Sequence, residues 1–166
     1  MGLILKGIHV LQNTRYVPQS LFDRCLDDEP KKKQEAVLTE AESVALYEKS
    51  VRRDLELLLN TRKSKISGIE RFAFVNKSIL NFGVAEMSDF DPRTTEGQEH
   101  IKTLIKSAIE LFEPRLSGVE VAVIDAGGDG KLNIKILALL EIALTLTPIS
   151  YDATLDTKTQ LYSLGG

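Results

Sequence analysis

The hydrophobic period of the sequence changes once, at "FEPRL" (residues 112–116), and this change constrains the fold more than any other feature. Before it, apolar residues recur every three or four positions, as in amphipathic helices. After it, "VEVAVID", "KLNIKILALL" and "ISYDATLD" alternate like half-buried strands, and "GGDG" is typical of a hairpin turn. Helices that precede strands predict an α+β fold, with N-terminal helices packed on a C-terminal antiparallel β-sheet, a meander.

Two long helices are predicted before this change. Thr39 with Glu42, and Thr95 with Gln98, have the spacing of capping boxes. The apolar stripes behind them are expected to face the core, although a stripe of this kind can also form a partner groove. The first stripe is Val44, Tyr47, Val51, Leu55 and Leu58, and the second is Ile101, Leu104, Ile105, Ala108, Ile109 and Phe112. Between them, residues 70–90 fit a strand or a helix, and a short helix that ends at Gly83 is favoured.

The chain is predicted to have an N-terminal arm, residues 1–38, followed by a single α+β domain, residues 39–166. In the arm, Ser20 with Asp23 indicates a short helix, and Pro30 with the neighbouring lysines is typical of a solvated linker. A length of 166 residues, 43% of them hydrophobic, suits one domain with a sizeable core.

Composition excludes several classes of function. A net charge of -3 gives no electrostatic footprint for nucleic acid, so proteins are the expected partners. The single Cys25, with His9 and His100 far apart, indicates neither an internal disulfide nor a zinc site, and no cofactor is expected. The N-terminal "LILKGIHVL" is too short and too interrupted for a signal peptide or a membrane span, so no membrane insertion and a cytoplasmic location are predicted.

Glu113, Pro114 and Arg115 stand at the change of period itself. Pro114 disfavours helical geometry at the residue before it, so the helix is expected to end near Phe112. In an extended stretch, residues two apart share a face, and Glu113 and Arg115 are therefore predicted to point the same way. The pair has two interpretations: an internal ion pair or helix-end cap, and a docking site for a partner. Spacing alone does not separate them.

Catalytic and calcium chemistry are not expected. Glu113 is the one acid in a distinctive context, and beside Arg115 it should stay ionised, which is the wrong state for the general acid of a glycosidase. The loop from Asp125 has Asp129 and Gly130 placed as in a calcium loop, but Ile136 stands where a bidentate glutamate is needed. These features predict a protein without enzymatic activity and a plain hairpin turn.

Five short stretches resemble a known family when taken in order. They are "SLFDR" with "DDEP", "SVRRDLELLLNTR", "SILNFGV" and "FEPRL". In this order and spacing they resemble TssE, the type VI secretion baseplate family related to the wedge protein of contractile phage tails and labelled lysozyme-like. The likeness covers about residues 18–155, and "RDLELLLNTR" and the Glu-Pro-Arg triplet are its most specific parts. The chain departs from the family at "NFGVAEM", where a Tyr-Gly-Leu-Pro run is usual.

The resemblance implies a structural baseplate component that links wedge proteins to the contractile sheath and helps to initiate sheath assembly. The implied partners are the wedge proteins TssF and TssG, with TssK as a further candidate, and the sheath proteins TssB and TssC. The implied place is the cytoplasm, at a baseplate docked to the inner-membrane complex. A small regulatory binder of the same fold is the alternative function, and a peptidoglycan hydrolase is the least favoured. The N-terminal arm favours the assembly role, because it would have no function in a binder that acts alone.

The resemblance also implies which residues contact partners. The Glu-Pro-Arg triplet would dock on a helical bundle of TssF and TssG, where an arginine fork is strong. The strands would extend a sheet shared with the sheath, by strand addition to an open edge in "ISYDATLD". The predicted partner-binding residues are Glu113, Pro114 and Arg115, Leu21, Phe22, Asp23 and Arg24 of the arm, and Tyr151 of the strand region.

Overall fold

The computed structural model describes residues 17, 19–25, 38–86, 91–127, 130–142 and 145–165. By packing, the chain divides into two units, Met1–Glu48 and Lys49–Gly166. Helix α2 (Glu40–Asn60) begins in the first unit and ends in the second. The predicted division into an arm, residues 1–38, and a domain, residues 39–166, stays a prediction.

The first unit contains α1 (Leu21–Cys25) and the start of α2. The expected short helix is confirmed, because the Asp23 amide donates to Ser20 Oγ at 3.1 Å. The capping box is confirmed as well: the Glu42 amide donates to Thr39 Oγ1, and the Thr39 amide donates to Glu42 Oε2 at 2.8 Å. The buried Ser43 ties the segment before α1 to this helix, since its hydroxyl accepts a hydrogen bond from the amide of Val17.

The second long helix, α4 (Thr95–Phe112), begins one residue earlier than its predicted cap implied. Thr94, not Thr95, is the N-cap, and its hydroxyl accepts a hydrogen bond from the Gly97 amide at 3.0 Å. Thr94 has the extended backbone that a cap requires, whereas Thr95 is already helical. Gly97 makes this start possible, because a Cβ there would lie 2.0 Å from the carbonyl oxygen of Asp91.

The sheet is the antiparallel meander that the sequence predicts, so the α+β fold is confirmed. Its strands follow the order β1 (Leu116–Gly127), β2 (Lys131–Ile142), β3 (Thr145–Asp156) and β4 (Leu161–Gly165). Sequence alternation indicated β1, β2 and the second half of β3. It did not indicate β4, and it did not indicate the first half of β3, which contains Pro148.

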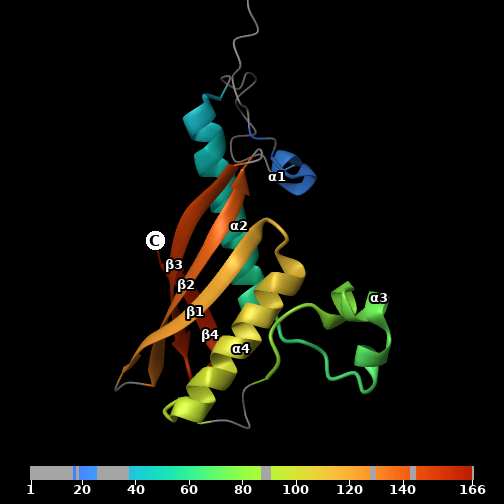
Figure 1. Cartoon of the computed structure of the whole chain (residues 1–166), viewed down its shortest axis with the longest axis vertical. Helices are drawn as coiled ribbons and strands as arrows, with labels where there is room; N and C mark the ends of the chain where they lie inside the picture. Colours follow the sequence, from blue (N-terminus) through green and yellow to red (C-terminus); the bar gives the residue numbers. More distant parts are fainter. Residues whose placement is uncertain are drawn as a thin grey trace, which may run out of the picture. The chain divides into compact units, whose positions relative to one another are not determined.

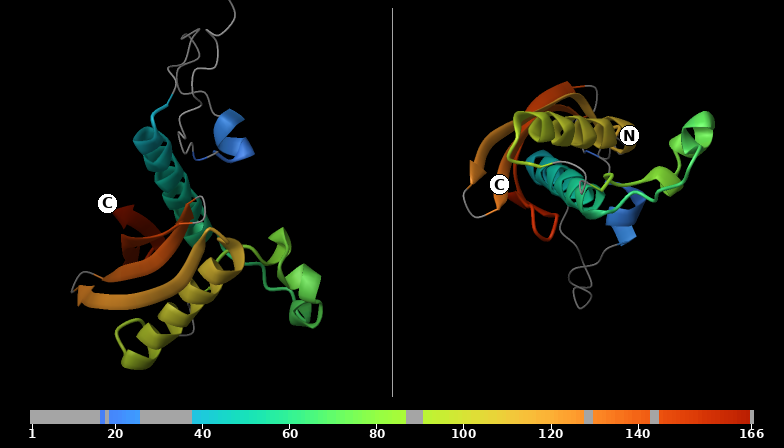
Figure 2. Two further views of the ribbon diagram at one scale, coloured as in Figure 1. Left: turned by 45° about the horizontal axis from the view of Figure 1, so that its top comes forward. Right: turned by 90° about the horizontal axis from the view of Figure 1, so that it is seen from below.

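One face of the sheet packs against α4 and the end of α2, which lie side by side in Figures 1 and 2. Every second side chain of β2 is buried along the whole strand, and those between are exposed or half-buried. The core unites this face with Val51, Leu55 and Leu58 of α2 and with Ile101, Ile105, Ala108 and Ile109 of α4, so Leu55 and Leu58 are buried in it rather than lining a partner groove. The other predicted stripe residues, Val44, Tyr47, Leu104 and Phe112, are half-buried. Its largest buried side chains are Val51, Leu55, Leu58, Leu59, Ile101, Ile105, Ile109, Leu132, Ile134, Ile136, Leu140 and Leu155.

The expected helix ending at Gly83 is wrong. Its place is taken by three short turns, η1 (Ile69–Arg71), α3 (Ala73–Asn76) and η2 (Ile79–Asn81). Side chains that bond the local backbone interrupt the helical ladder. Ser78 is extended, and its hydroxyl accepts from the Leu80 amide and donates to the carbonyl of Val75, while the Asn81 side-chain amide donates to the Asn76 carbonyl. We call residues 66–82 the apolar loop.

Candidate partner-binding sites

Arg115 lies at the centre of a cluster of charged side chains where α4 meets β1. The helix ends at Phe112 as predicted, and Glu113 leaves helical geometry with φ -119° and ψ 79°. The Arg115 guanidinium donates to both oxygens of the Glu113 carboxylate, from Nε to Oε1 at 2.6 Å and from Nη2 to Oε2 at 2.5 Å, and the Arg115 amide also donates to Oε1. The two side chains therefore share a face, as the spacing predicts.

The same guanidinium also reaches α2. Its Nη2 donates to Asp54 Oδ2 at 2.7 Å, and its Nη1 donates to Ser50 Oγ at 3.1 Å. Arg53 in turn donates to the other carboxylate oxygen of Asp54, from Nη2 at 2.7 Å. The cluster thus ties the turn between α4 and β1 to α2, which lies some sixty residues earlier in the chain.

Arg115 is partly buried, and hydrogen bonds offset the cost of burying its charge. Glu113 is only 4% exposed, and the Arg115 side chain is 20% exposed. Burial opposes the charge of the guanidinium, but the hydrogen bonds to Glu113 and Asp54 outweigh it and raise the pKa of Arg115 above its ordinary value. A buried carboxylate that is matched by a bidentate arginine in this way is a structural brace. These contacts are those of the internal alternative, and docking by the triplet stays a prediction.

This arrangement offers no acid for glycoside hydrolysis. Glu113 and Asp54 both accept hydrogen bonds from the same guanidinium, so these two carboxyl groups are held by Arg115 rather than placed on either side of a cleft. Among the residues that the structure describes, no group of three acids, histidines or cysteines lies close enough to hold a metal ion. Asp129 of the expected hairpin lies outside the described residues, so the prediction that calcium does not bind there stays a prediction.

The other predicted contact residues fall in different surroundings. Leu21 and Phe22 of α1 are exposed, and Asp23 is half-buried where it bonds Ser20, while the Arg24 side chain lies outside the described residues. Tyr151 is buried, on the face of β3 that meets the helices, opposite Ile136 in the ladder. It lies in the core rather than on the exposed face, and its role as a partner contact stays a prediction.

The outer edge of β4 is covered by side chains of α2 and the residues after it. Asn60 mimics a neighbouring strand, since its Nδ2 donates to the Tyr162 carbonyl at 2.9 Å and its Oδ1 accepts from the Tyr162 amide at 2.8 Å. Arg52 donates to the carbonyl of Leu164, and Arg62 donates to that of Gln160. An added strand would have to displace these bonds, so β4 is a protected edge.

The outer edge of β3 is open over part of its length. β4 pairs only with residues 152–156, so within the described part of the chain no strand covers the outer side of residues 145–151. The ladder between β2 and β3 is regular throughout, whereas the ladder of β1, the other edge strand, shifts register twice. Because register shifts blunt an edge, residues 145–151 form the flattest edge available for strand addition.

The apolar loop is a surface that the sequence analysis missed. Its large apolar side chains Phe72, Phe74, Ile79 and Leu80 are exposed, Phe74 by 93% and Ile79 by 85%. The signal that could have revealed it is the pair Gly68 and Gly83, both with positive φ, which bracket an apolar run too short for a core helix.

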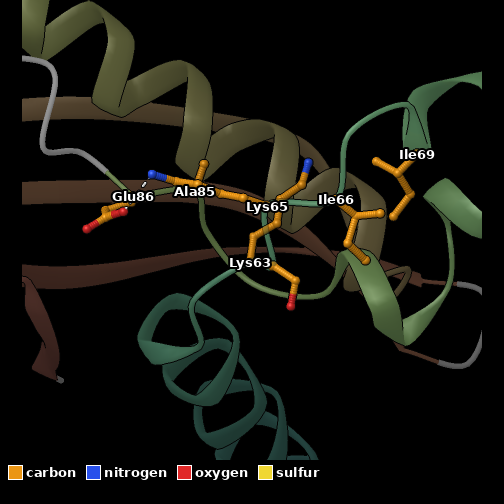
Figure 3. Close-up of a pocket in the computed structure, with 7 residues that line it drawn as sticks. Lys63, Lys65, Ile66, Ile69, Ala85 and Glu86 are labelled. Carbon is orange, nitrogen blue, oxygen red and sulfur yellow. Dashed lines mark ion pairs between the residues drawn. The ribbon is translucent and has the colours of Figure 1, made fainter.

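A shallow hollow lies at the base of the apolar loop (Figure 3). Lys65 and Glu86 pair across it at 2.9 Å, and the hydrogen bond from Lys65 lowers the pKa of Glu86. The residues that line it are Lys63, Ser64, Lys65, Ile66, Ile69, Ala85 and Glu86. Its one acid, Glu86, is exposed and paired with Lys65, so the hollow offers no catalytic constellation.

Comparison with known proteins agrees with the fold and the motifs. The family model described as "Baseplate wedge protein gp25" matches residues 45–143, from α2 to the end of β2. The comparison with curated individual proteins gave no match. Among the described helices, none has the length and apolar character needed to cross a membrane. Because the matched residues are more than half of the chain, it belongs to the baseplate wedge protein gp25 family, the family of TssE, whose members are structural components of phage-tail-like baseplates.

Proposed function

We propose that this chain is the TssE component of a type VI secretion baseplate. It would sit in the cytoplasm beneath the inner-membrane complex and join the wedge proteins TssF and TssG, with TssK nearby, to the first ring of the TssB and TssC sheath. Family membership supports a baseplate role. The observation that carries the link to the sheath is the contrast between the covered edge of β4 and the open edge of β3 at residues 145–151.

Backbone geometry specifies what the open edge offers. The backbone amide and carbonyl of Tyr162 bond Asn60, so these groups point away from β3. Leu155, which pairs with Tyr162 in the ladder, therefore directs its own amide and carbonyl toward β2. Because backbone direction alternates along a strand, residues 146, 148 and 150 present their groups at the outer edge. Pro148 therefore costs no hydrogen bond to β2. An added sheath strand would find the amides and carbonyls of Leu146 and Ser150 and the carbonyl of Pro148.

The wedge partners would meet a different part of the surface. Pro114 is exposed at the turn that the Arg115 cluster holds in place, so the buried pair positions this proline for contact. Leu21 and Phe22 of α1, with Asp23 and Arg24 beside them, would supply a second contact, since exposed apolar side chains of this size are typical of interfaces.

A proline at residue 150 tests the edge. Ser150→Pro removes one outward amide and leaves the bonds from β3 to β2 in place, so the purified variant should stay folded while sheath assembly in cells is lost. Ser150→Ala is the matched control, because it keeps the amide and should assemble sheaths normally. Sheath formation can be counted by fluorescence microscopy of a labelled sheath protein. Normal sheath counts with a folded Ser150→Pro protein would contradict the proposal.

A further inference from the structure

The apolar loop keeps several large side chains exposed, and nothing in the described part of its unit covers them. Figures 1 and 2 both show α3 and its flanking turns projecting away from the sheet and α4. Within nine residues, four large apolar side chains are exposed: Phe72, Phe74, Ile79 and Leu80. Single exposed apolar residues are normal on a protein surface, but several large ones gathered on one short loop point to an interaction site.

Backbone hydrogen bonds and one aromatic contact fix the base of the apolar loop. At its base, the Val84 amide donates to the Thr61 carbonyl at 2.9 Å, and the Lys63 amide donates to the Val84 carbonyl at 3.0 Å. Gly83 allows this closure, because a Cβ there would lie 2.3 Å from the carbonyl oxygen of Thr61. Phe82 then anchors the loop to α4 by an edge-to-face contact with Phe112, with ring centroids 5.3 Å apart.

The charge around the loop is opposite to that of the chain. Residues 61–86 contain five lysines or arginines and two glutamates, in a protein of net charge -3. Arg71 and Lys77 are both exposed; Arg71 directly precedes Phe72, and Lys77 lies between Phe74 and Ile79 in the sequence. A surface that combines apolar anchors with neighbouring cations is complementary to an apolar groove that carries carboxylates on its rim.

We propose that the apolar loop is a docking element that inserts into an apolar groove of another baseplate protein, with acidic residues on the rim of that groove facing Arg71 and Lys77. The identity of the partner as a baseplate protein rests on the proposed function. A protein is favoured over an anionic membrane for two reasons. A loop that is preorganised by hydrogen bonds gains affinity for a partner surface of fixed shape, but it gains little on a fluid membrane. The chain as a whole is acidic and is repelled by anionic lipid.

The binding test uses the whole chain and, as probe, the purified complex of the other baseplate proteins of the same machine. The double variant Phe74→Ser with Ile79→Ser should weaken binding about tenfold or more, because buried apolar anchors dominate interface energies. The matched control is Ile124→Ser with Leu161→Ser, two exposed apolar residues on the sheet, which should bind like the wild type. Both variants should remain folded, since the replaced side chains are exposed.

The charge test uses Arg71→Glu with Lys77→Glu, which should also weaken binding, and Arg71→Lys with Lys77→Arg, which should preserve it. Cross-linking then identifies the occupant: a benzophenone amino acid at residue 74 should label a baseplate protein at a peptide that contains both apolar and acidic residues. Labelling of a second copy, or of residues 3–11 of this chain, would overturn the proposal. So would co-sedimentation with vesicles of phosphatidylglycerol and phosphatidylcholine that is lost in the Phe74→Ser, Ile79→Ser variant.

The two proposals fail in different ways. If the wild-type chain does not bind the baseplate complex at all, both the proposed function and the docking loop are wrong. If the wild type binds and the Phe74→Ser, Ile79→Ser variant binds equally well, the docking loop alone is wrong.

Discussion

The charged triplet at residues 113–115 and the apolar loop differ in burial, in the opposite sense to what their side chains would suggest. The triplet contains a carboxylate and a guanidinium, yet Glu113 is buried and Arg115 is held by side-chain hydrogen bonds to Glu113, Ser50 and Asp54. The loop contains Phe74 and Ile79, which are almost fully exposed. The difference teaches that satisfied hydrogen bonds can bury charge, and that local turn chemistry can expose apolar side chains.

The largest effect is expected when the charged cluster is broken. Arg115→Ala leaves the buried Glu113 without its partner and should lower the free energy of unfolding by about 3 kcal/mol. Arg115→Lys keeps the charge but loses the planar fork, so its loss should be smaller. Urea unfolding measures both, with Arg71→Ala in the exposed loop as the control, where a change within about 0.5 kcal/mol is expected. Equal losses in Arg115→Ala and Arg71→Ala would show that the cluster is no brace.

The second-largest loss of stability is expected at the edge of β4. Asn60→Ala removes both hydrogen bonds to Tyr162 and should cost about 1 to 2 kcal/mol in unfolding free energy. Hydrogen exchange at the Tyr162 amide should also become faster, because its acceptor is gone. Thr103→Ala, which removes an exposed hydroxyl on α4, is the control. If the exchange rate of Tyr162 does not change, the edge of β4 is protected by something other than Asn60.

The apolar loop should respond in the opposite way to the cluster. Replacing Phe74 and Ile79 by serine removes exposed side chains, so the free energy of unfolding should change by no more than about 0.5 kcal/mol. The protein should bind less of a fluorescent dye that reports exposed apolar surface. A loss of stability comparable to that of Arg115→Ala would mean that the loop packs against the protein itself.

The smallest effect concerns an exposed carboxylate. Hydrogen bonds from the amide and hydroxyl of Thr39 lower the pKa of Glu42 below its ordinary value of 4.5. Its contribution to stability is therefore present above pH 4.5 and is lost as the pH falls through the lower folded pKa. Glu42→Gln should remove this pH dependence. An NMR titration of the Glu42 carboxylate checks it, and a pKa at or above 4.5 would contradict the capping contact.

Periodicity was sufficient to predict the long elements of the fold. α2, α4, β1 and β2 are long enough for their apolar residues to reveal the repeat, and their buried faces match it. β4 has five residues, too few for alternation to be distinctive. The first half of β3 contains Pro148, a residue that argues against a strand in the sequence. The expected helix in residues 70–83 failed because Ser78 and Asn81 bond the local backbone.

The candidate sites were less predictable than the fold. The sequence placed Glu113 beside Arg115, but the partners on α2, Ser50 and Asp54, lie 65 and 61 residues from Arg115. Only the folded chain brings them together, so spacing could not separate an internal brace from a docking pair. The open edge has the same origin, because it depends on where β4 stops along β3.

The most direct test of the account measures melting temperature and affinity for the other baseplate proteins on the same two variants. Arg115→Ala should melt at a markedly lower temperature, and any loss of binding should accompany that loss of stability, because the cluster that holds the turn at Pro114 is broken. The Phe74→Ser, Ile79→Ser variant should melt like the wild type and bind at least about tenfold more weakly. An Arg115→Ala protein of normal stability that no longer binds, together with a loop variant that binds normally, would contradict the account and make the charged triplet the docking site.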